Sequence, residues 1–355
     1  MRHDAPVRNL AHLPKAHLHL HLTGSMRPST AVELAARQGR TLPAGLLDPA
    51  SVDLDVTVRR GWSKFQRLYD AARDLLVGEA EVRRVLSETV AHEAVLGTRW
   101  LELQVDPTTY GPRLGGLQAT VELVLDALSV AGAEHGVGTA VVIAASRARH
   151  PAEAETLARL AGRFVGRGVV GFGLSNDETR GFAEDWTKAF RLAREAGLVA
   201  APHAGELRGP RSVRAAVEAL GAGRLGHGVR AVEDPALLEV LAARGIVCEV
   251  CPASNVALGV TRSLAEVPVV VLREAGVPVA LGADDPLVFR SDLLDQYAAL
   301  RGQGLSDAAL ADLAACSIKG SCAPALVQAE LLAEVAGWLA SPAGRPPVDR
   351  ARPPG

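Results

Sequence analysis

The 355-residue chain has few cysteines, little net charge and no long apolar run. Its four cysteines are too few for a disulfide framework, which predicts a reducing, cytoplasmic setting. Its formal net charge of −2 gives no support for binding to nucleic acid or to a membrane surface. No stretch is long enough to span a membrane, and residues 1–15 lack the apolar segment of a signal peptide. These absences predict a soluble globular protein.

Several common catalytic signatures are missing as well. There is no phosphate-binding loop and no serine-centred nucleophile elbow. The segment GAGRLG (221–226) has the spacing of a dinucleotide-binding turn, but it precedes a predicted strand instead of opening a helix after one. Cys248 and Cys251 form a Cys-x-x-Cys, yet on a strand they would face opposite sides, with no second Cys or His pair nearby. We therefore interpret them as buried structural thiols. The His-x-Glu that accompanies Pro-Cys-x-x-Cys in one class of zinc enzymes is absent.

What the chain does contain is a recurring pattern of short apolar, β-branched runs, most followed by a turn signal and a helical pattern. The runs lie at 15–22, 99–105, 138–145, 169–174, 197–203, 224–229, 245–250 and 277–283. Helical patterns lie at 152–165, 183–196, 210–221, 234–244 and 264–275, with closing helices at 305–340. Eight strands that alternate with helices and are apolar on both faces predict a (β/α)8 TIM barrel. We predict one domain over 1–355, with a disordered tail from about residue 341.

The gap between the first two predicted strands is much longer than the others and has a helical pattern. It predicts a helical insertion after the first strand. Trp62, Phe65 and Tyr69 fall on one face of this insertion. Two interpretations stay open for these aromatic residues, plain core packing or a lid over the barrel mouth.

The segment PKAHLHLHLTGS (14–25) places three histidines on one face of the first strand. Neighbouring histidines start about 7 Å apart, which two imidazoles can bridge through one metal ion, whereas His17 and His21 start about 13 Å apart. The run therefore offers one metal pair, His17/His19 or His19/His21. Barrel enzymes work at the C-terminal ends of their strands, which favours His19/His21 and leaves His17 as a structural residue.

Other predicted strands end in conspicuous polar groups. HAGE contributes His203 and Glu206, GHG contributes His227, and ADDP contributes Asp284 and Asp285. Two histidines, a third histidine and a carboxylate on one rim form a possible Zn²⁺ set with room for water. Such a metal lowers the pKa of its water towards about 7. The remaining titratable groups could then move the protons of an addition–elimination reaction.

The motifs PKAHLHLHLTGS, HAGE, RLGHG and GADDP, in this order and at these separations, resemble the adenosine deaminase family of the amidohydrolase superfamily over residues 10–340. The resemblance implies one Zn²⁺ per chain and hydrolytic loss of a purine 6-amino group as ammonia. The implied zinc ligands are His19, His21, His203 and Asp284. Glu206 would protonate the ring nitrogen beside the attacked carbon, His227 would orient and deprotonate the water, and Asp285 would bond the imidazole part of the purine.

Departures from the family pattern concern the substrate. Thr23 stands where an Asp that contacts the ribose 5′-hydroxyl is usual, and His17 stands where Glu is usual. In GFGLSNDE, Gly173 replaces an Asp, and Asn176 replaces a glycine whose backbone amide contacts the purine. This pattern favours an adenosine with an altered 5′ position. The segments TGSMRP and CPASNVALGV resemble the aminodeoxyfutalosine deaminases of menaquinone synthesis, whose substrate carboxylate could meet Arg147, Arg149 or Lys64.

We therefore predict an adenosine or aminodeoxyfutalosine deaminase, with an adenine deaminase or a catalytically idle purine-binding protein as alternatives. The intact Glu206 and Asp284 argue against the idle binder. The expected partner is a small 6-aminopurine, with no nucleic acid and no membrane, and the oligomeric state is left open. The expected catalytic residues are Glu206, His227 and Asp284, and the expected substrate contacts are Asp285, Asn176, Thr23 and His21.

Overall fold

A single parallel sheet of eight strands forms the centre of the structure, a computed structural model that describes residues 8–57 and 61–343. The strands follow chain order from β1 to β8. They are β1 (Lys15–His21), β2 (Thr98–Val105), β3 (Gly138–Ser146), β4 (Val169–Ser175), β5 (Val199–Ala204), β6 (Arg224–His227), β7 (Val247–Val250) and β8 (Val279–Leu281). Each lies inside its predicted range or extends it by one residue. The predicted (β/α)8 barrel is confirmed.

The barrel closes between β8 and β1, next to several predicted site residues. The backbone N–H of His21 donates to the carbonyl oxygen of Asp284 (3.1 Å), and the N–H of Asp284 donates to the carbonyl oxygen of His19 (3.0 Å). A parallel bridge pairs Leu20 with Asp284 between them. Closure therefore fixes the backbones of three predicted metal ligands relative to one another.

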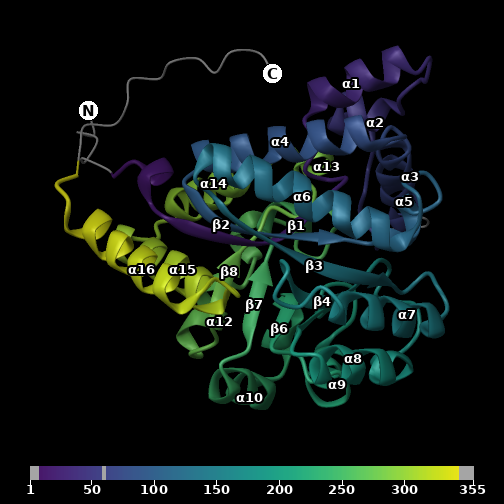
Figure 1. Ribbon diagram of the computed structural model, residues 1–355. Helices are drawn as coiled ribbons and strands as arrows, with labels where there is room; N and C mark the ends of the chain where they lie inside the picture. The colour runs from purple at the N-terminus through teal and green to yellow at the C-terminus, as the bar shows by residue number, and fades with distance from the viewer. Residues whose placement is uncertain (1–7, 58–60, 344–355) are drawn as a thin grey trace.

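Helices surround the sheet (Figure 1). They are α1 (Pro28–Arg37), α2 (Ala44–Leu47), α3 (Gly61–Arg73), α4 (Glu79–Val95), α5 (Pro107–Tyr110), α6 (Leu117–His135), α7 (Pro151–Gly162), α8 (Thr187–Glu195), α9 (Pro210–Ala219), α10 (Pro235–Arg244), α11 (Pro252–Ala257), α12 (Val269–Glu274), α13 (Pro286–Phe289), α14 (Leu293–Gly302), α15 (Asp307–Gly320) and α16 (Ala325–Ala340). Seven of them begin with proline, whose fixed φ suits the first helical position, where an N–H has no partner within the helix.

Two predicted helices are divided. The stretch predicted at 183–196 is a short 3₁₀ helix (Ala183–Trp186) followed by α8. The stretch predicted at 264–275 is a 3₁₀ helix (Leu264–Glu266) followed by α12, because Pro268 disfavours a helical conformation at Val267.

The predicted insertion after β1 contains α1, α2 and α3, which lie together with α5 at one end of the molecule in Figure 1. Next in the chain comes α4, which packs against α6 on the outside of the barrel. In α3 the buried Phe65 stacks on Phe289 of α13, with ring centroids 5.6 Å apart. The insertion is therefore packed onto the loop that follows β8.

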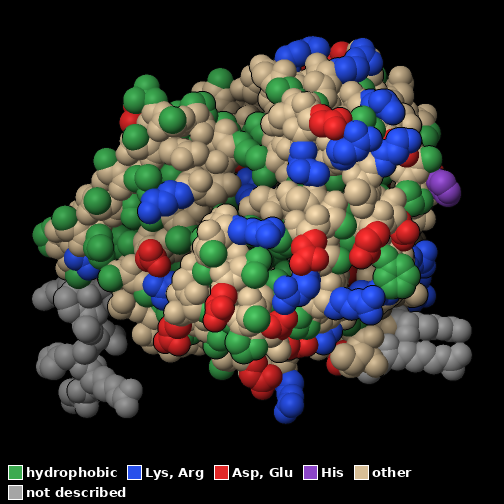
Figure 2. Space-filling view, turned by 90° about the horizontal axis from the view of Figure 1, so that it is seen from below, with side chains coloured by type: hydrophobic (Ala, Val, Ile, Leu, Met, Phe, Trp, Pro, Cys, Tyr) green, Lys and Arg blue, Asp and Glu red, His purple; other side chains and the backbone are tan. Residues whose placement is uncertain are grey.

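Lys/Arg and Asp/Glu side chains are interspersed on the face shown in Figure 2, in keeping with the small net charge. Among the described residues, the search for a helix long and apolar enough to cross a membrane finds none. The tail predicted to be disordered from about residue 341 falls mostly on 344–355, outside the described residues.

Candidate active site

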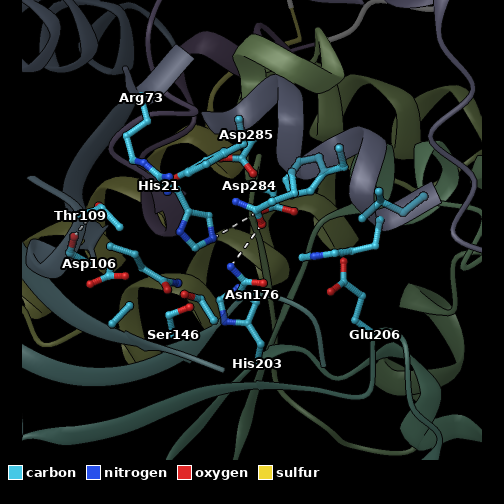
Figure 3. Close-up of a pocket in the computed structure, with 18 of the residues that line it drawn as sticks. His21, Arg73, Asp106, Thr109, Ser146, Asn176, His203, Glu206, Asp284 and Asp285 are labelled. Carbon is cyan, nitrogen blue, oxygen red and sulfur yellow. Dashed lines mark hydrogen bonds and ion pairs between the residues drawn. The ribbon is translucent and has the colours of Figure 1, made fainter. Parts of the chain in front are cut away.

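Four side chains from the ends of β1, β5 and β8 converge at the barrel mouth, and Figure 3 labels three of them, His21, His203 and Asp284. The ligand atoms of His19, His21, His203 and Asp284 all lie within 4.8 Å of one another. Asp284 Oδ1 is 3.2 Å from His21 Nε2 and 3.6 Å from His19 Nε2. His19 Nε2 is buried and has no hydrogen-bond partner among the described residues. Three imidazoles and one carboxylate gathered at one point fit a divalent cation such as Zn²⁺.

A second group of possible ligands shares Asp284 with this cluster. The ligand atoms of His227, Cys251 and Asp284 also lie within 4.8 Å of one another. Burial raises the pKa of the Cys251 thiol well above its usual value, so the thiol stays protonated at neutral pH. Because the thiolate is the metal-binding form, the three-histidine cluster is the better cation site. Cys248 and Cys251 are both buried and not joined by a disulfide.

His17 lies outside the ligand cluster and supports it through a hydrogen bond to the neighbouring backbone. It is fully buried, and its Nδ1 lies 3.0 Å from Glu93 Oε2. Its Nε2 accepts the backbone N–H of Ala283 (3.0 Å), the residue before Asp284. The side chain therefore holds the backbone that presents Asp284.

Buried ion pairs run from His19 through the barrel interior. His19 Nδ1 is 2.9 Å from Glu249 Oε2, Glu249 Oε1 is 2.8 Å from Arg224 Nε, and Arg224 Nη2 is 2.6 Å from Glu102 Oε2. A carboxylate bonded to Nδ1–H leaves Nε2 as the metal-binding nitrogen and fixes the ring orientation. Sequence reasoning missed these three residues. Their signal was a charged residue inside each of the apolar runs RWLELQV, RLGHGV and GIVCEV.

The two predicted proton-transfer groups, Glu206 and His227, lie side by side, and their pKa values are shifted in opposite directions. Glu206 Oε1 is 3.5 Å from His227 Nε2, and the Asn255 amide nitrogen is 3.3 Å from His227 Nδ1. Burial lowers the pKa of His227 to about 3, so its imidazole is neutral and can accept a proton. Burial and the carboxylates of Asp284 and Glu178 raise the pKa of Glu206 well above its usual value. The two environments therefore favour a neutral imidazole and a protonated carboxyl.

The loop that carries Glu206 is clamped by Glu178, a residue that sequence reasoning did not assign to the site. Glu178 is almost fully buried, and its carboxylate accepts five hydrogen bonds of 2.6–3.0 Å. The donors are the backbone N–H groups of Gly205, Glu206, Leu207 and Arg208 and the hydroxyl of Ser212. The available signal was its place at the end of GFGLSNDE.

Three predicted site residues have left-handed backbone conformations without being glycine. They are Asn176 (φ 74°), His227 (φ 66°) and Asp284 (φ 62°), each at or just beyond the end of a strand. Such conformations cost about 1–3 kcal/mol each and persist where surrounding structure imposes them. Their occurrence at three strand ends marks this rim as the functional part of the barrel.

A cavity opens over the cluster, and α3 forms part of its wall. Trp62, Phe65 and Tyr69 all line it, while Phe65 also packs on Phe289. Phe65 therefore takes part in core packing, all three aromatic residues lie in the cavity wall, and the lid interpretation stays a prediction. The spacing of 62, 65 and 69 continues to Arg73, which also lines the cavity and was missed in the sequence.

The predicted substrate contacts occupy different places. Asp285, Asn176 and His21 line the cavity, and Asp285 Oδ1 is buried without a hydrogen-bond partner in the described part of the chain. Thr23 is fully buried and is not among the described lining residues. Its hydroxyl lies 2.6 Å from the hydroxyl of Tyr110, which does line the cavity. Thr23 therefore reaches the cavity through Tyr110.

The cations proposed to meet a substrate carboxylate are engaged elsewhere, and none is among the described lining residues. Arg147 donates to the backbone oxygen of His203 (3.0 Å), Arg149 pairs with Glu153 (2.9 Å), and Lys64 donates to the backbone oxygen of Asp53 (2.9 Å). This part of the prediction is corrected by the structure, because the cation that does line the cavity is Arg73.

Comparison with known proteins agrees with this geometry. The family model for adenosine deaminase matches residues 14–338. A Streptomyces coelicolor protein named "Putative adenosine/adenine deaminase" is 54% identical over 94% of this chain and 98% of its own length. An aminodeoxyfutalosine deaminase of the same organism is 36% identical over 94% of this chain and 87% of its own length. The crystal structure of adenine deaminase from Arthrobacter aurescens has a TM-score of 0.83 and 28% identity, covering 95% of this chain and all of that chain.

Proposed function

Because the chain belongs to the adenosine deaminase family of the amidohydrolase superfamily and is a hydrolytic deaminase, we propose that its substrate is an uncharged 6-aminopurine nucleoside such as adenosine. Water adds at C6 of the purine, and the 6-amino group leaves as ammonia to give the 6-oxopurine. The observation that carries the proposal is the cavity itself. It continues from Glu206 past His21 to a second polar wall that contains Arg73 and Asp106, where a sugar would lie.

The metal of the reaction is proposed to be one Zn²⁺ held by His19, His21, His203 and Asp284. Nitrogen-rich sets of this kind favour zinc, and the unpartnered His19 Nε2 supports a cation at this point. When bound, the cation would lower the pKa of a coordinated water to about 7 and so supply a nucleophile at neutral pH. Ser254 donates to Asp284 Oδ2 (2.6 Å), which leaves Oδ1 directed at the histidines.

Side chains of the protein then accept and donate the protons of the reaction. We propose that His227 takes a proton from the attacking water, since its lowered pKa keeps the ring neutral. Glu206, whose raised pKa favours the protonated carboxyl, would donate to the ring nitrogen beside C6. Asp285 would hold the imidazole side of the purine through its unpartnered Oδ1.

The choice of nucleoside is supported by the two relatives from one organism. Streptomyces coelicolor contains an aminodeoxyfutalosine deaminase and, separately, the protein that is 54% identical to this chain. The chain resembles the second much more than the first, which argues against a role in menaquinone synthesis. Free adenine is the second candidate, because the Arthrobacter aurescens structure of the same fold is an adenine deaminase.

The test is ammonia release by zinc-loaded protein offered adenosine, adenine and aminodeoxyfutalosine side by side. We expect the highest kcat/KM for adenosine. A hundredfold preference for aminodeoxyfutalosine would restore the menaquinone assignment, and a preference for adenine would make the protein a base deaminase. Release from none of the three, with metal bound, would contradict the deaminase chemistry.

A further inference from the structure

The cavity has two polar sides that differ in position and chemistry. In Figure 3, Arg73, Asp106 and Thr109 lie on one side of His21, and Glu206 lies on the other. The Glu206 side is the one proposed to hold the purine ring. The opposite side, made of Arg73, Asp106 and Thr109 and called the distal wall below, has no part in the proposed chemistry.

The distal wall presents polar atoms whose hydrogen-bonding capacity is not satisfied by other described residues. Arg73 Nε is buried and has no hydrogen-bond partner in the described part of the chain. Asp106 caps α5, and both hydrogen bonds that its carboxylate accepts from described residues, from the Thr108 N–H and hydroxyl, fall on Oδ1. Arg73 Nε can therefore donate and Asp106 Oδ2 can accept, and one hydroxyl group would satisfy both, since a hydroxyl both accepts and donates.

The wall lies at the position of the substrate's 5′ end. Tyr110 belongs to α5, the helix capped by Asp106, and its hydroxyl contacts Thr23. Position 23 is where the family resemblance places the contact with a ribose 5′-hydroxyl. Because Thr23 is sealed behind Tyr110, that contact falls to the groups that do face the cavity.

The charge of the cavity disfavours an anionic 5′ group. The distal wall itself carries one carboxylate, that of Asp106, and one guanidinium, that of Arg73. Arg73 is already paired, with its Nη2 2.6 Å from Asp70 Oδ1. Burial raises the pKa of Asp106 against the opposing effect of the charges on Arg149 and Arg73, because a half-buried wall solvates a negative charge poorly.

We propose that the distal wall binds the 5′-hydroxyl of an uncharged nucleoside through Arg73 and Asp106 and selects against a 5′-phosphate or 5′-carboxylate. This inference rests on the proposed function and narrows its substrate class. Asp106 accepts the hydroxyl proton, and Arg73 Nε donates to the hydroxyl oxygen.

The first test uses the zinc-loaded wild-type enzyme and measures kcat/KM for adenosine, 5′-deoxyadenosine, adenosine 5′-monophosphate, adenosine 5′-carboxylate and adenine. We expect both anions to fall at least about 100-fold below adenosine, because like charges brought together at a binding site are strongly disfavoured. Loss of the hydroxyl in 5′-deoxyadenosine should cost about tenfold, since Arg73 Nε and the Asp106 carboxylate would both be left without their partner.

The second test uses two variants with matched controls. Asp106→Asn keeps a good helix cap and removes one negative charge, so the monophosphate should gain at least about tenfold relative to adenosine. Arg73→Met should reduce kcat/KM for adenosine and leave 5′-deoxyadenosine nearly unchanged. The controls are Asp126→Asn and Arg67→Met, exposed residues on α6 and α3 that should leave all ratios unchanged.

The outcomes separate the inference from the function. Equal or better turnover of the monophosphate, of 5′-deoxyadenosine or of adenine, compared with adenosine, would overturn the role of the distal wall while leaving the deaminase reaction intact. No ammonia from any compound would overturn the proposed function instead. Because the substrate series needs only the wild-type protein, a variant that fails to fold does not remove the test.

Discussion

The two sides of the cavity are held in place in different ways. On the metal and acid side, the supporting contacts are distant in sequence: Glu249 holds His19, and Glu178 holds the loop of Glu206. On the distal wall, the side-chain bonds of the polar groups are local, since Arg73 pairs with Asp70 three residues before it and Asp106 bonds to Thr108, although the packing of α3 on α13 places the helix.

This difference separates the chemistry from substrate choice. Contacts between distant strands exist only when the barrel is closed, so the reactive groups share the stability of the whole fold. The distal wall is built from the end of α3 and the start of α5, where a substitution disturbs few other elements. We therefore expect substitutions on the first side to abolish the reaction and substitutions on the second to redirect it.

The largest effect is expected from Glu206→Gln. The amide cannot donate a carboxylic proton to the purine ring, so kcat should fall by about 100-fold or more while zinc stays bound. Ammonia release and metal content measured on the same sample check this. The matched control is Glu218→Gln, an exposed position on α9 that should leave kcat unchanged. A near-normal rate in the first variant would remove Glu206 from the mechanism.

Glu249→Gln should act on the metal. The change weakens the bond that orients His19, and loss of such a carboxylate typically reduces metal affinity about 10–100-fold. Competition with a chelator of known zinc affinity measures this directly. Glu239→Gln, exposed on α10, is the control. Unchanged zinc affinity in Glu249→Gln would show that His19 does not depend on the buried ion pairs.

The same difference explains how much of the molecule could be predicted from the sequence. The eight strands and the ligand histidines were visible because apolar runs end in polar residues, and those ends meet on one rim of a barrel. Glu102, Arg224 and Glu249 were missed because their pairing depends on strand register, which no single strand reveals.

The errors in charge placement have a similar cause. Arg147 follows a strand end, as a substrate-binding residue would, but its guanidinium bonds to the backbone of His203. Arg73 lies in the insertion, far from any strand end, and reaches the cavity because α3 packs onto α13. The position of an inserted helix is set by tertiary packing and cannot be derived from local spacing.

Glu178→Gln tests the hydrogen bonds that hold the loop of Glu206, and it should reduce kcat less than Glu206→Gln does. One amide oxygen can still accept some of the five hydrogen bonds, so we expect kcat to fall about tenfold with zinc content unchanged. The carboxylate of Glu178 helps to raise the pKa of Glu206, which must be protonated to act. Removing that charge should lower the pKa and shift the alkaline limb of kcat to lower pH. An unshifted limb would leave Glu178 a merely structural role.

The smallest effect on catalysis is expected from Thr23→Val, which keeps the shape and removes the hydroxyl. The buried Tyr110 hydroxyl would lose its 2.6 Å partner, which should reduce the free energy of unfolding by about 1–3 kcal/mol. Because Thr23 lies behind the cavity wall, kcat/KM for adenosine and for 5′-deoxyadenosine should change equally and by less than about threefold, a difference below 1 kcal/mol. Denaturant unfolding and the two rate constants measure both effects. A loss of kcat/KM confined to adenosine would show that Thr23 itself contacts the 5′-hydroxyl. The 5′-hydroxyl would then bind behind Tyr110 and not at the distal wall.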